Sequence, residues 1–579
     1  MDKLGFIRVA AAVPVVAVAD TKTNTHRICS LIESAVEKQV SLLVFPELCV
    51  TGCTCGDLFL QNLVLEESEN AVEEIARFCK SLPITVIIGA PFADGAKREQ
   101  CTVVISNGEI IDVVPSGDNR IYDLDGALVS LQPDESAHIV VMPSSDAEDI
   151  YSHNTIKGNL CACSSMDACA YIYCNAGFGE STGDNVFSGY SAIFEAGSVL
   201  AESRPFNTEA TLAVADIDLQ EIEHRKSLSY AETSPDEPVI LPVVPATDFR
   251  KKLFRSTDPM PFIPDESGLE TAFEIQAAGL ATRLSKINCE RAVIGVSGGL
   301  DSTLALLCAV NAFDKLGLDR KGIIGITMPG FGTSARTHGN ADRLMEELGI
   351  SRREIDITES CRLHLKEIGH DGTTQDVTFE NAQARERTQI LMDTANAENA
   401  IVIGTGDLSE LALGWCTYNG DHMSNYSVNA SIPKTLIRAM VLHSAETAYK
   451  GTEAGKILKD IVDTPVSPEL KGDRSGIIQK TEDIIGPYEL HDFFIWYIVG
   501  KGFSPEKTIF LAQKAFEGRY DKAEIIDCMK TFVKRLFSQQ FKRSCSPDGP
   551  KVTPVSFSPR EGWCIPSDAS ADIMLENIK

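Results

Sequence analysis

Short apolar runs alternate with helical patterns in the first half of the chain. Two buried strands and two amphipathic helices are predicted, at residues 41–46, 84–90, 25–39 and 66–79. Between residues 103 and 114, two β-branched runs flank Asn107-Gly108, a residue pair that favours the type I′ turn of a hairpin. The pattern therefore predicts a strand-rich sandwich with helices on its outside.

The second half carries a different order of elements. Helices and strands are expected to alternate there, at residues 267–287, 292–296, 303–313 and 322–328. Strand, glycine turn, helix and strand in succession are typical of a doubly wound parallel sheet. Seven prolines between Pro235 and Pro264 prevent a continuous helix or central strand. We therefore expect an α/β protein with domains at 1–240 and 269–579, joined by a linker at 241–268.

Composition limits the class of protein. The chain has 579 residues, of which 44% are hydrophobic and 23% charged, so it can bury large cores. Its formal net charge of −29 repels nucleic acid and anionic membranes, and no apolar run approaches the length of a membrane-spanning helix. The apolar start at residues 7–20 lacks a basic leader, which favours a buried strand over a signal segment.

Cysteine usage indicates the compartment. The 17 cysteines are scattered and show no disulfide framework. The pairs Cys53/Cys55 and Cys161/Cys163 lack the C-x-x-C spacing with which two thiolates bind one zinc ion. We therefore expect free, mostly buried thiols in a cytoplasmic protein.

A candidate anion-binding loop follows the strand at 292–296. Ser297-Gly298-Gly299-Leu300-Asp301-Ser302 leads from this strand into a helix. The glycines let the backbone approach a ligand, and the free N–H groups of the helix start attract an anion. Ser297 and Ser302 add hydroxyl donors, and Asp301 can hold Mg²⁺ against phosphates. An ordinary strand-to-helix turn needs neither the serines nor the acid, and the loop matches neither Walker A nor G-x-G-x-x-G.

This loop resembles the pyrophosphate loop of ATP pyrophosphatases, which join AMP to a substrate oxygen. Other segments are similar to NAD synthetases, and the resemblance to that family spans about residues 270–570. These segments are 328–333, 380–385, 404–410, 414–423, 464–470, 540–543 and 547–552.

The resemblance implies a reaction and a site. ATP would convert the nicotinate carboxylate of deamido-NAD (nicotinate adenine dinucleotide) into an acyl-adenylate, releasing pyrophosphate, and ammonia would then displace AMP to give NAD, with Mg²⁺ offsetting phosphate charge. The implied ATP site comprises Gly295, Val296, Ser297, Gly298, Gly299, Leu300, Asp301, Ser302 and Thr405. The implied deamido-NAD site comprises Asn381, Glu410, His422, Met423, Ser424, Asn425 and a C-terminal lysine, Lys542 or Lys551. Asp301 and Glu410 are the implied metal ligands.

The first half resembles the nitrilase-like glutaminase domain that is fused to glutamine-dependent NAD synthetases. The similar segments are 45–48, 51–52, 57–59, 136–145, 171–181 and 186–189. The resemblance implies a nitrilase α-β-β-α sandwich over about residues 5–220. Its glutamine chemistry uses a cysteine nucleophile, a lysine and a glutamate, and Glu47 stands at the glutamate position.

The cysteine and the lysine are absent from the matching positions. In the family, the lysine follows a Val-Val-Pro strand, and the cysteine lies between that strand and the segment matched by 136–145. Here Ser116 follows Pro115, no lysine occurs from 99 to 156, and no cysteine occurs from 102 to 160. We therefore expect that the nucleophile strand is deleted, that the glutaminase is degenerate and that free ammonia is the nitrogen donor.

Two alternatives stay open. A relocated triad could use Lys157, Cys161 or Cys163, which would make the protein a glutamine-dependent enzyme of unconventional design. The N-terminal half could also be an assembly module that builds a homo-oligomer around the synthetase. The expected ligands are ATP, Mg²⁺, deamido-NAD and ammonia, or glutamine in the first alternative, with no nucleic acid and no membrane.

Overall fold

The chain forms two compact units in the computed structural model, which describes residues 5–95, 97–134, 136–228, 257–331, 335–464 and 482–578. The first unit comprises residues 1–146, 153–180 and 187–257, and the second comprises 147–152, 181–186 and 258–579. Two short segments of the first half of the sequence therefore belong to the second unit. Most of the expected linker, and residues 332–333 and 465–470 of the quoted segments, lie outside the described residues.

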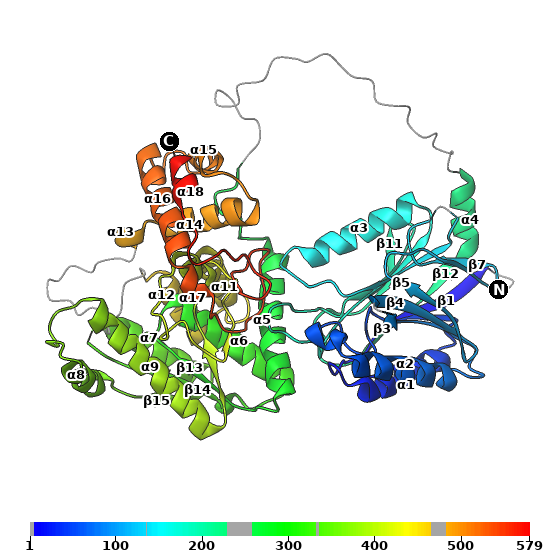
Figure 1. Ribbon diagram of the computed structural model, residues 1–579, viewed down its shortest axis with the longest axis horizontal. Coiled ribbons are helices and arrows are strands. Elements are labelled where there is room, and N and C mark those ends of the chain that lie inside the picture. The colour runs from blue at the N-terminus through cyan, green and yellow to red at the C-terminus, as the bar shows by residue number, and fades with distance from the viewer. Residues whose placement is uncertain are drawn as a thin grey trace, which may run out of the picture. The chain divides into compact units, whose positions relative to one another are not determined.

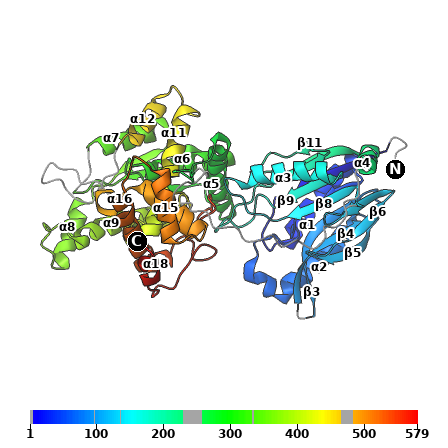
Figure 2. The ribbon, with the colours of Figure 1, turned by 90° about the horizontal axis from the view of Figure 1, so that it is seen from above.

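The first unit is a sandwich of four layers. Two six-stranded sheets, with the orders β12-β1-β2-β3-β4-β5 and β11-β10-β9-β8-β7-β6, pack face to face. Helices α1 and α2 cover the first sheet and α3 covers the second (Figure 1, Figure 2). The elements are β1 (Phe6–Val13), α1 (Thr21–Glu37), β2 (Leu42–Val44), η1 (Gly56–Leu60), α2 (Asn62–Phe78), β3 (Thr85–Asp94), β4 (Lys97–Ser106), β5 (Glu109–Pro115), β6 (Ile121–Leu124), β7 (Ala127–Ser130), β8 (Ile139–Ser144), α3 (Ser152–Met166), β9 (Ala170–Asn175), β10 (Ser191–Glu195), β11 (Ser198–Glu202), β12 (Thr211–Asp218) and α4 (Leu219–Leu228).

Alternating side chains explain why central strands such as β2 and β9 are buried at every position. Val44 and Ile172 point into the core between the two sheets, whereas Leu43 packs toward α1 and α2 and Tyr171 toward α3. Because successive side chains of a strand point to opposite faces, a strand covered on both faces needs apolar residues at every position. The expected sandwich of the nitrilase type is confirmed.

The residue pair Asn107-Gly108 predicted the hairpin correctly, but the apolar pattern overestimated the length of the first strand. Asn107 and Gly108 have φ angles of 52° and 82°, as a type I′ turn between β4 and β5 requires. The strand predicted over residues 7–20 ends at Val13, because Pro14 follows and has no N–H for the ladder. Within the described residues, no helix is both long and apolar enough to cross a membrane.

The second unit is built on a parallel five-stranded sheet of order β15-β14-β13-β16-β17, which confirms the doubly wound prediction. Leu391 of α9 packs on one face, and Met345 of α7 packs against Gly325 on the other. The elements are α5 (Glu266–Lys286), β13 (Ala292–Gly295), α6 (Leu300–Leu316), η2 (Arg320–Gly322), β14 (Ile323–Thr327), α7 (Ala335–Glu347), β15 (Ser351–Glu354), α8 (Thr358–Glu367), α9 (Val377–Glu398), β16 (Ile401–Gly404), α10 (Leu408–Leu413), β17 (Tyr426–Ser427), α11 (Lys434–Glu446), α12 (Glu453–Val462), α13 (Glu482–Ile485), α14 (Tyr488–Phe494), the π-helix η3 (Ile495–Gly500), α15 (Pro505–Ala515), α16 (Lys522–Ser538), α17 (Gln540–Arg543) and α18 (Asp572–Glu576).

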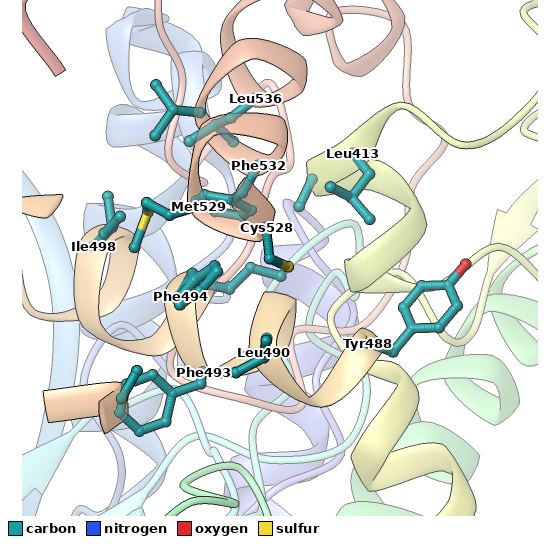
Figure 3. Packing of buried hydrophobic residues seen from close by; sticks show 14 of the residues in the cluster. Leu413, Tyr488, Leu490, Phe493, Phe494, Ile498, Cys528, Met529, Phe532 and Leu536 are labelled. Carbon is teal, nitrogen blue, oxygen red and sulfur yellow. The ribbon is translucent and has the colours of Figure 1, made fainter. Parts of the chain in front are cut away.

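An aromatic core joins the C-terminal helices to α10. Phe494 of α14 and Phe532 of α16 pack edge to face, with ring centroids 5.7 Å apart (Figure 3). The buried Arg543 donates to the carbonyl oxygens of Leu411 and Ala412, each at 3.1 Å, and so satisfies the carboxyl end of α10. The segment 540–543 therefore holds α10, which carries part of the candidate site.

Candidate active site

The anion-binding loop joins β13 to α6. Helix α6 begins at Leu300 rather than at the predicted 303, because Gly299 is already its extended N-cap. Gly298 has a φ of +85°, a left-handed conformation that favours glycine. The hydroxyl oxygens of Ser297 and Ser302 lie 3.2 Å apart. The first turn of α6 thus presents free N–H groups and two hydroxyls to an anion.

A cavity of about 890 Å³ opens beside this loop. It lies at the carboxyl ends of β13, β14 and β16, where the strand order of the sheet reverses, the usual ligand position in such sheets. Most of the site residues predicted from the sequence line this cavity. They are residues 295–302, Asn381, Thr405, Glu410, Met423 and Lys542.

Other predicted residues do not line this cavity. His422 lines a smaller cavity, described below. The Asn425 side chain accepts the N–H of Val402 at 2.8 Å and so extends the sheet beside β16. Ser424 is packed against Gly404, with its hydroxyl oxygen 2.3 Å from where a Cβ would stand. Asn425 and Ser424 therefore shape the floor of the site through the backbone.

Of the two candidate lysines, the structure brings Lys542 to the cavity. Its Nζ donates to the carbonyl oxygens of Gly414 and Cys416, each at 2.7 Å, and burial lowers the pKa of this amine. Lys551 lines neither this cavity nor the smaller one, and its backbone N–H donates to the carbonyl oxygen of Asp184 at 2.7 Å. Lys542 is the lysine placed to meet a ligand.

Three carboxylates and one lysine meet at the edge of the cavity. Oxygen atoms of Asp301, Asp407 and Glu410 lie within 4.8 Å of one another. The Nζ of Lys434 lies 2.9 Å from both oxygens of Asp301, 2.5 Å from Asp407 and 3.2 Å from Glu410. Since the Lys434 side chain is only 6% exposed, these ion pairs are needed to offset its desolvation.

Burial and charge set the protonation of this cluster. Burial raises the pKa of Glu410 to about 7 and that of Asp407 well above its ordinary value, although the Lys434 ammonium opposes both shifts. Burial alone would lower the pKa of Lys434, but the three carboxylates outweigh it and raise that pKa well above its ordinary value. Lys434 therefore stays protonated.

The sequence pointed to Asp301 and Glu410 but not to Asp407, Lys434 or Asn429. Asp407 is the N-cap of α10 and accepts the N–H of Glu410 at 2.8 Å, a capping pattern visible in the segment 404–410. The buried Asn429 donates to the carbonyl oxygens of Asp301 and Thr405, at 2.9 and 3.1 Å, and ties the two halves of the site together. Nothing in the sequence marks Lys434 or Asn429 as unusual.

The donor set suits a hard divalent cation. Carboxylate oxygens are the ligands that Mg²⁺ prefers, and Asp301, Asp407 and Glu410 supply them beside the phosphate loop. In the part of the chain that the structure describes, no other group of three such side chains comes together.

A second cavity, of about 20 Å³, shares Glu410 and Asp421 with the large one. Its polar lining is Asp407, Glu410, Asp421, His422, Ser427 and Ser546. Because about 10–15 Å³ suffices for one water, this cavity takes a molecule of the size of water or ammonia. Burial raises the pKa of Asp421.

The first unit holds a cavity of about 90 Å³ around Glu47. Ser116, which follows β5, and Leu131 and Gln132, which follow β7, line it, and the lining includes neither lysine nor cysteine among the described residues. Ser145 donates to Glu47 Oε2 at 2.8 Å, and burial raises the pKa of Glu47. A strand, β7, does lie beside β8, but its carboxyl end carries no thiol.

The cysteines of the first unit are poor substitutes for a nucleophile at this cavity. Burial and the Glu180 carboxylate raise the pKa of the Cys53 thiol far above its usual range. Cys161 and Cys163 pack between α3 and the second sheet and do not line the Glu47 cavity. Lys157 is paired with Glu202 at 2.8 Å.

Comparison with known proteins agrees with this fold, which defines an enzyme of the ATP pyrophosphatase class preceded by a nitrilase-like unit. A family described as NAD synthase matches residues 273–518, and one described as carbon–nitrogen hydrolase matches residues 8–142. A glutamine-dependent NAD(+) synthetase of Mycobacterium leprae is 34% identical over 667 residues, covering 99% of this chain and 98% of that protein. One of Aquifex aeolicus is 25% identical and covers 95% and 97%.

The chain belongs to the glutamine-dependent NAD(+) synthetase family, so its activity is the ATP-dependent amidation of deamido-NAD to NAD. The fold agrees with two solved structures of such synthetases. That from Cytophaga hutchinsonii has a TM-score of 0.79 and 18% identity over 99% of this chain and all of that one. That from Acinetobacter baumannii, bound to ADP, has a TM-score of 0.64 and 17% identity over 96% and 98%.

Proposed function

We propose that this protein makes NAD with free ammonia as the nitrogen donor and that its first unit does not hydrolyse glutamine. The observation that carries the proposal is the lining of the Glu47 cavity. Where the family pattern calls for a lysine after β5 and a cysteine before β8, the cavity presents Ser116, Leu131 and Gln132. Glu47 alone offers a base but no nucleophile and no cation for the oxyanion.

Chain length supports the same proposal. The alignment with the Mycobacterium leprae relative runs over 667 residues, 88 more than the 579 of this chain, so at least 88 positions of the relative have no counterpart here. A relocated triad finds little support, since Cys161 and Cys163 lie on α3, away from the lining of the Glu47 cavity, and Lys157 is paired with Glu202.

The second unit supplies the groups that adenylation needs. The loop 297–302 would hold the pyrophosphate arm of ATP, with Thr405 beside it and Lys542 near the dinucleotide. Asp301, Asp407 and Glu410 would hold Mg²⁺, which when bound offsets the negative charge on the departing pyrophosphate. The nicotinate carboxylate attacks the α-phosphorus of ATP, the bond to pyrophosphate breaks, and an acyl-adenylate forms.

The small cavity would receive the nitrogen donor. Its carboxylates, Glu410 and Asp421, attract ammonium by charge, and Asp421, which is not a proposed metal ligand, can take up a proton as the nitrogen attacks the acyl carbon. AMP leaves with the electrons of the broken mixed-anhydride bond, and the amide of NAD remains.

The test compares NAD formation with ammonium and with glutamine as the sole nitrogen donor, using glutamine freed of ammonium. We expect saturable turnover with ammonium and only background turnover with glutamine. The variants Cys161→Ser and Cys163→Ser should leave the ammonium reaction unchanged. Saturable turnover with glutamine that disappears in one cysteine variant would contradict the proposal and favour the relocated triad.

A further inference from the structure

Residues 181–186, from the first half of the sequence, are built into the second unit. The Thr182 hydroxyl donates to the carbonyl oxygen of Gly279 in α5 at 2.9 Å. The hydroxyl of Tyr426, in β17, donates to the carbonyl oxygen of Thr182, also at 2.9 Å. Both contacts are buried, so this segment is part of the interior of the second unit.

The same segment pairs with residues 548–551. The N–H of Gly549 donates to the carbonyl oxygen of Gly183 at 3.0 Å, and that of Lys551 donates to Asp184 at 2.7 Å. On the other side, the N–H of Ser427 donates to the carbonyl oxygen of Asp548 at 2.7 Å. Residues 548–551 therefore connect the segment 181–186 to β17 through main-chain hydrogen bonds.

An ion-pair network fixes this arrangement. The Asp184 side chain, only 10% exposed, accepts from Nε and Nη2 of Arg560 at 2.8 and 3.1 Å. Arg560 also pairs with Asp548 at 3.2 Å, and Asp548 pairs in turn with Arg283. A bidentate arginine–carboxylate pair sets geometry as well as energy, and removal of one partner leaves the other charge uncompensated. Asp184 thus holds Arg560, and through it Asp548, in place.

The network bears directly on the small cavity. Ser546 and Pro547, which precede Asp548, line that cavity together with Ser427. Residues 548–551 pack directly against β17, since a Cβ on Gly549 would stand 2.1 Å from the Ser427 carbonyl oxygen. A shift of Asp548 therefore moves the wall of the small cavity relative to its carboxylates, but does not touch the loop that lines the large one.

We propose that Asp184, contributed by the degenerate half of the chain, is a positioning residue for the amidation step. It keeps the wall formed by Ser546 and Pro547 in register with Glu410 and Asp421, so that ammonia is held where it meets the acyl-adenylate. This inference rests on the proposed use of the small cavity by ammonia. It gives the first half of the chain a role that needs no glutaminase chemistry.

The experiment measures two reactions of full-length Asp184→Asn. In NAD formation driven by ammonium, we expect the KM for ammonium to rise roughly tenfold, the loss typical of one charge-assisted contact. In pyrophosphate exchange into ATP with deamido-NAD, which needs no nitrogen donor, we expect no change. Asp184→Glu should recover part of the ammonium KM.

The matched control is Asp314→Asn. Asp314 is also bound by two guanidinium nitrogens of one arginine, Arg320, with Nε at 2.8 Å, but it lines neither cavity. An unchanged ammonium KM in Asp184→Asn, or an equal loss of both reactions, would overturn the inference. If Asp184→Asn does not fold, Arg560→Lys replaces it, because this variant keeps the charge but loses the second contact to Asp184. It should also raise the KM for ammonium and leave pyrophosphate exchange unchanged. Any other result would overturn the inference.

Failure of the proposed function is seen separately. Turnover of glutamine by the unaltered protein would contradict ammonia dependence, whereas the Asp184 measurements use ammonium alone and keep their meaning in that case.

Discussion

The Nζ of Lys434 lies 2.9 Å from each carboxylate oxygen of Asp301, and both residues line the large cavity where ATP and Mg²⁺ are expected to bind. With Asp407 and Glu410 also within reach of the same nitrogen, the ammonium is the internal counter-ion of an otherwise repulsive group. A divalent cation entering this group must share the carboxylates with Lys434, so the lysine and the metal compete for the same oxygens.

Replacement of Lys434 by methionine should therefore destabilise the protein most when Mg²⁺ is absent. Three clustered carboxylates, of which Asp407 is fully buried, would be left without their cation, and we expect the free energy of unfolding to fall by about 3–5 kcal/mol. Added Mg²⁺ should recover more stability in Lys434→Met than in the unaltered protein. Urea unfolding with and without Mg²⁺ checks this. Lys456→Met is the control, since the exposed Lys456 pairs with the half-exposed Glu453 at 2.9 Å and its loss should cost less than about 1 kcal/mol.

Gly298→Ala tests the phosphate loop. Because Gly298 has a φ of +85°, an alanine there strains the backbone by about 1–2 kcal/mol, and we expect the KM for ATP to rise several-fold. Gly317→Ala is the matched control, because Gly317 has a φ of +67° at the end of α6 but has open space around it and lines neither cavity. If both variants lose similar stability but only Gly298→Ala has a raised KM for ATP, the loop binds ATP as proposed. An equal KM for ATP in the two variants would contradict that role.

Asp421→Asn tests the small cavity. The amide keeps the acceptor for the Thr417 N–H, at 2.6 Å, but removes the charge that attracts ammonium. We expect kcat/KM for ammonium to fall at least roughly tenfold, while pyrophosphate exchange continues. Loss of both reactions together would place Asp421 in adenylation instead.

We expect the buried His491 to lower the stability of the protein in acid. Burial lowers the pKa of His491 from 6.5 to about 4, so the folded state binds fewer protons than the unfolded state between these values. The stability contributed by the neutral ring is therefore complete above about pH 6.5 and is lost as the pH falls toward 4, by roughly 3 kcal/mol in total.

His491→Gln should remove that part of the pH dependence, because the glutamine amide can still donate to the Ile485 carbonyl oxygen, now 2.9 Å from Nε2, without titrating in this range. Free energies of unfolding at pH 7 and pH 5 give the slope. An unchanged slope in His491→Gln would contradict the assignment.

Local signals in the sequence predicted individual helices, strands and turns, but they did not predict contacts between residues that are distant along the chain. Asn107-Gly108 predicted its hairpin because the turn depends on two residues, and the loop at 297–302 predicted a helix N-terminus for the same reason. The start of α6 at Leu300 was missed because Gly299 already takes the N-cap conformation, whereas the helix was predicted to begin at residue 303.

Contacts across the fold explain what the sequence could not show. Lys434 lies 133 residues from Asp301 along the chain, and only the packing of α11 against α6 brings them together. Lys542 lines the large cavity and Lys551 does not, a difference that depends on the docking of α17 on α10 and that no local sequence signal carries.

The threading of residues 147–152 and 181–186 into the second unit also bears on how such a gene can change. A break at the proline-rich linker looks harmless in the sequence, yet it would separate Asp184 from Arg560 and remove buried hydrogen bonds from the catalytic half. Recombination at that point cannot exchange one half for a foreign one without replacing these contacts as well. The first half can therefore lose its own chemistry and still be inherited together with the second.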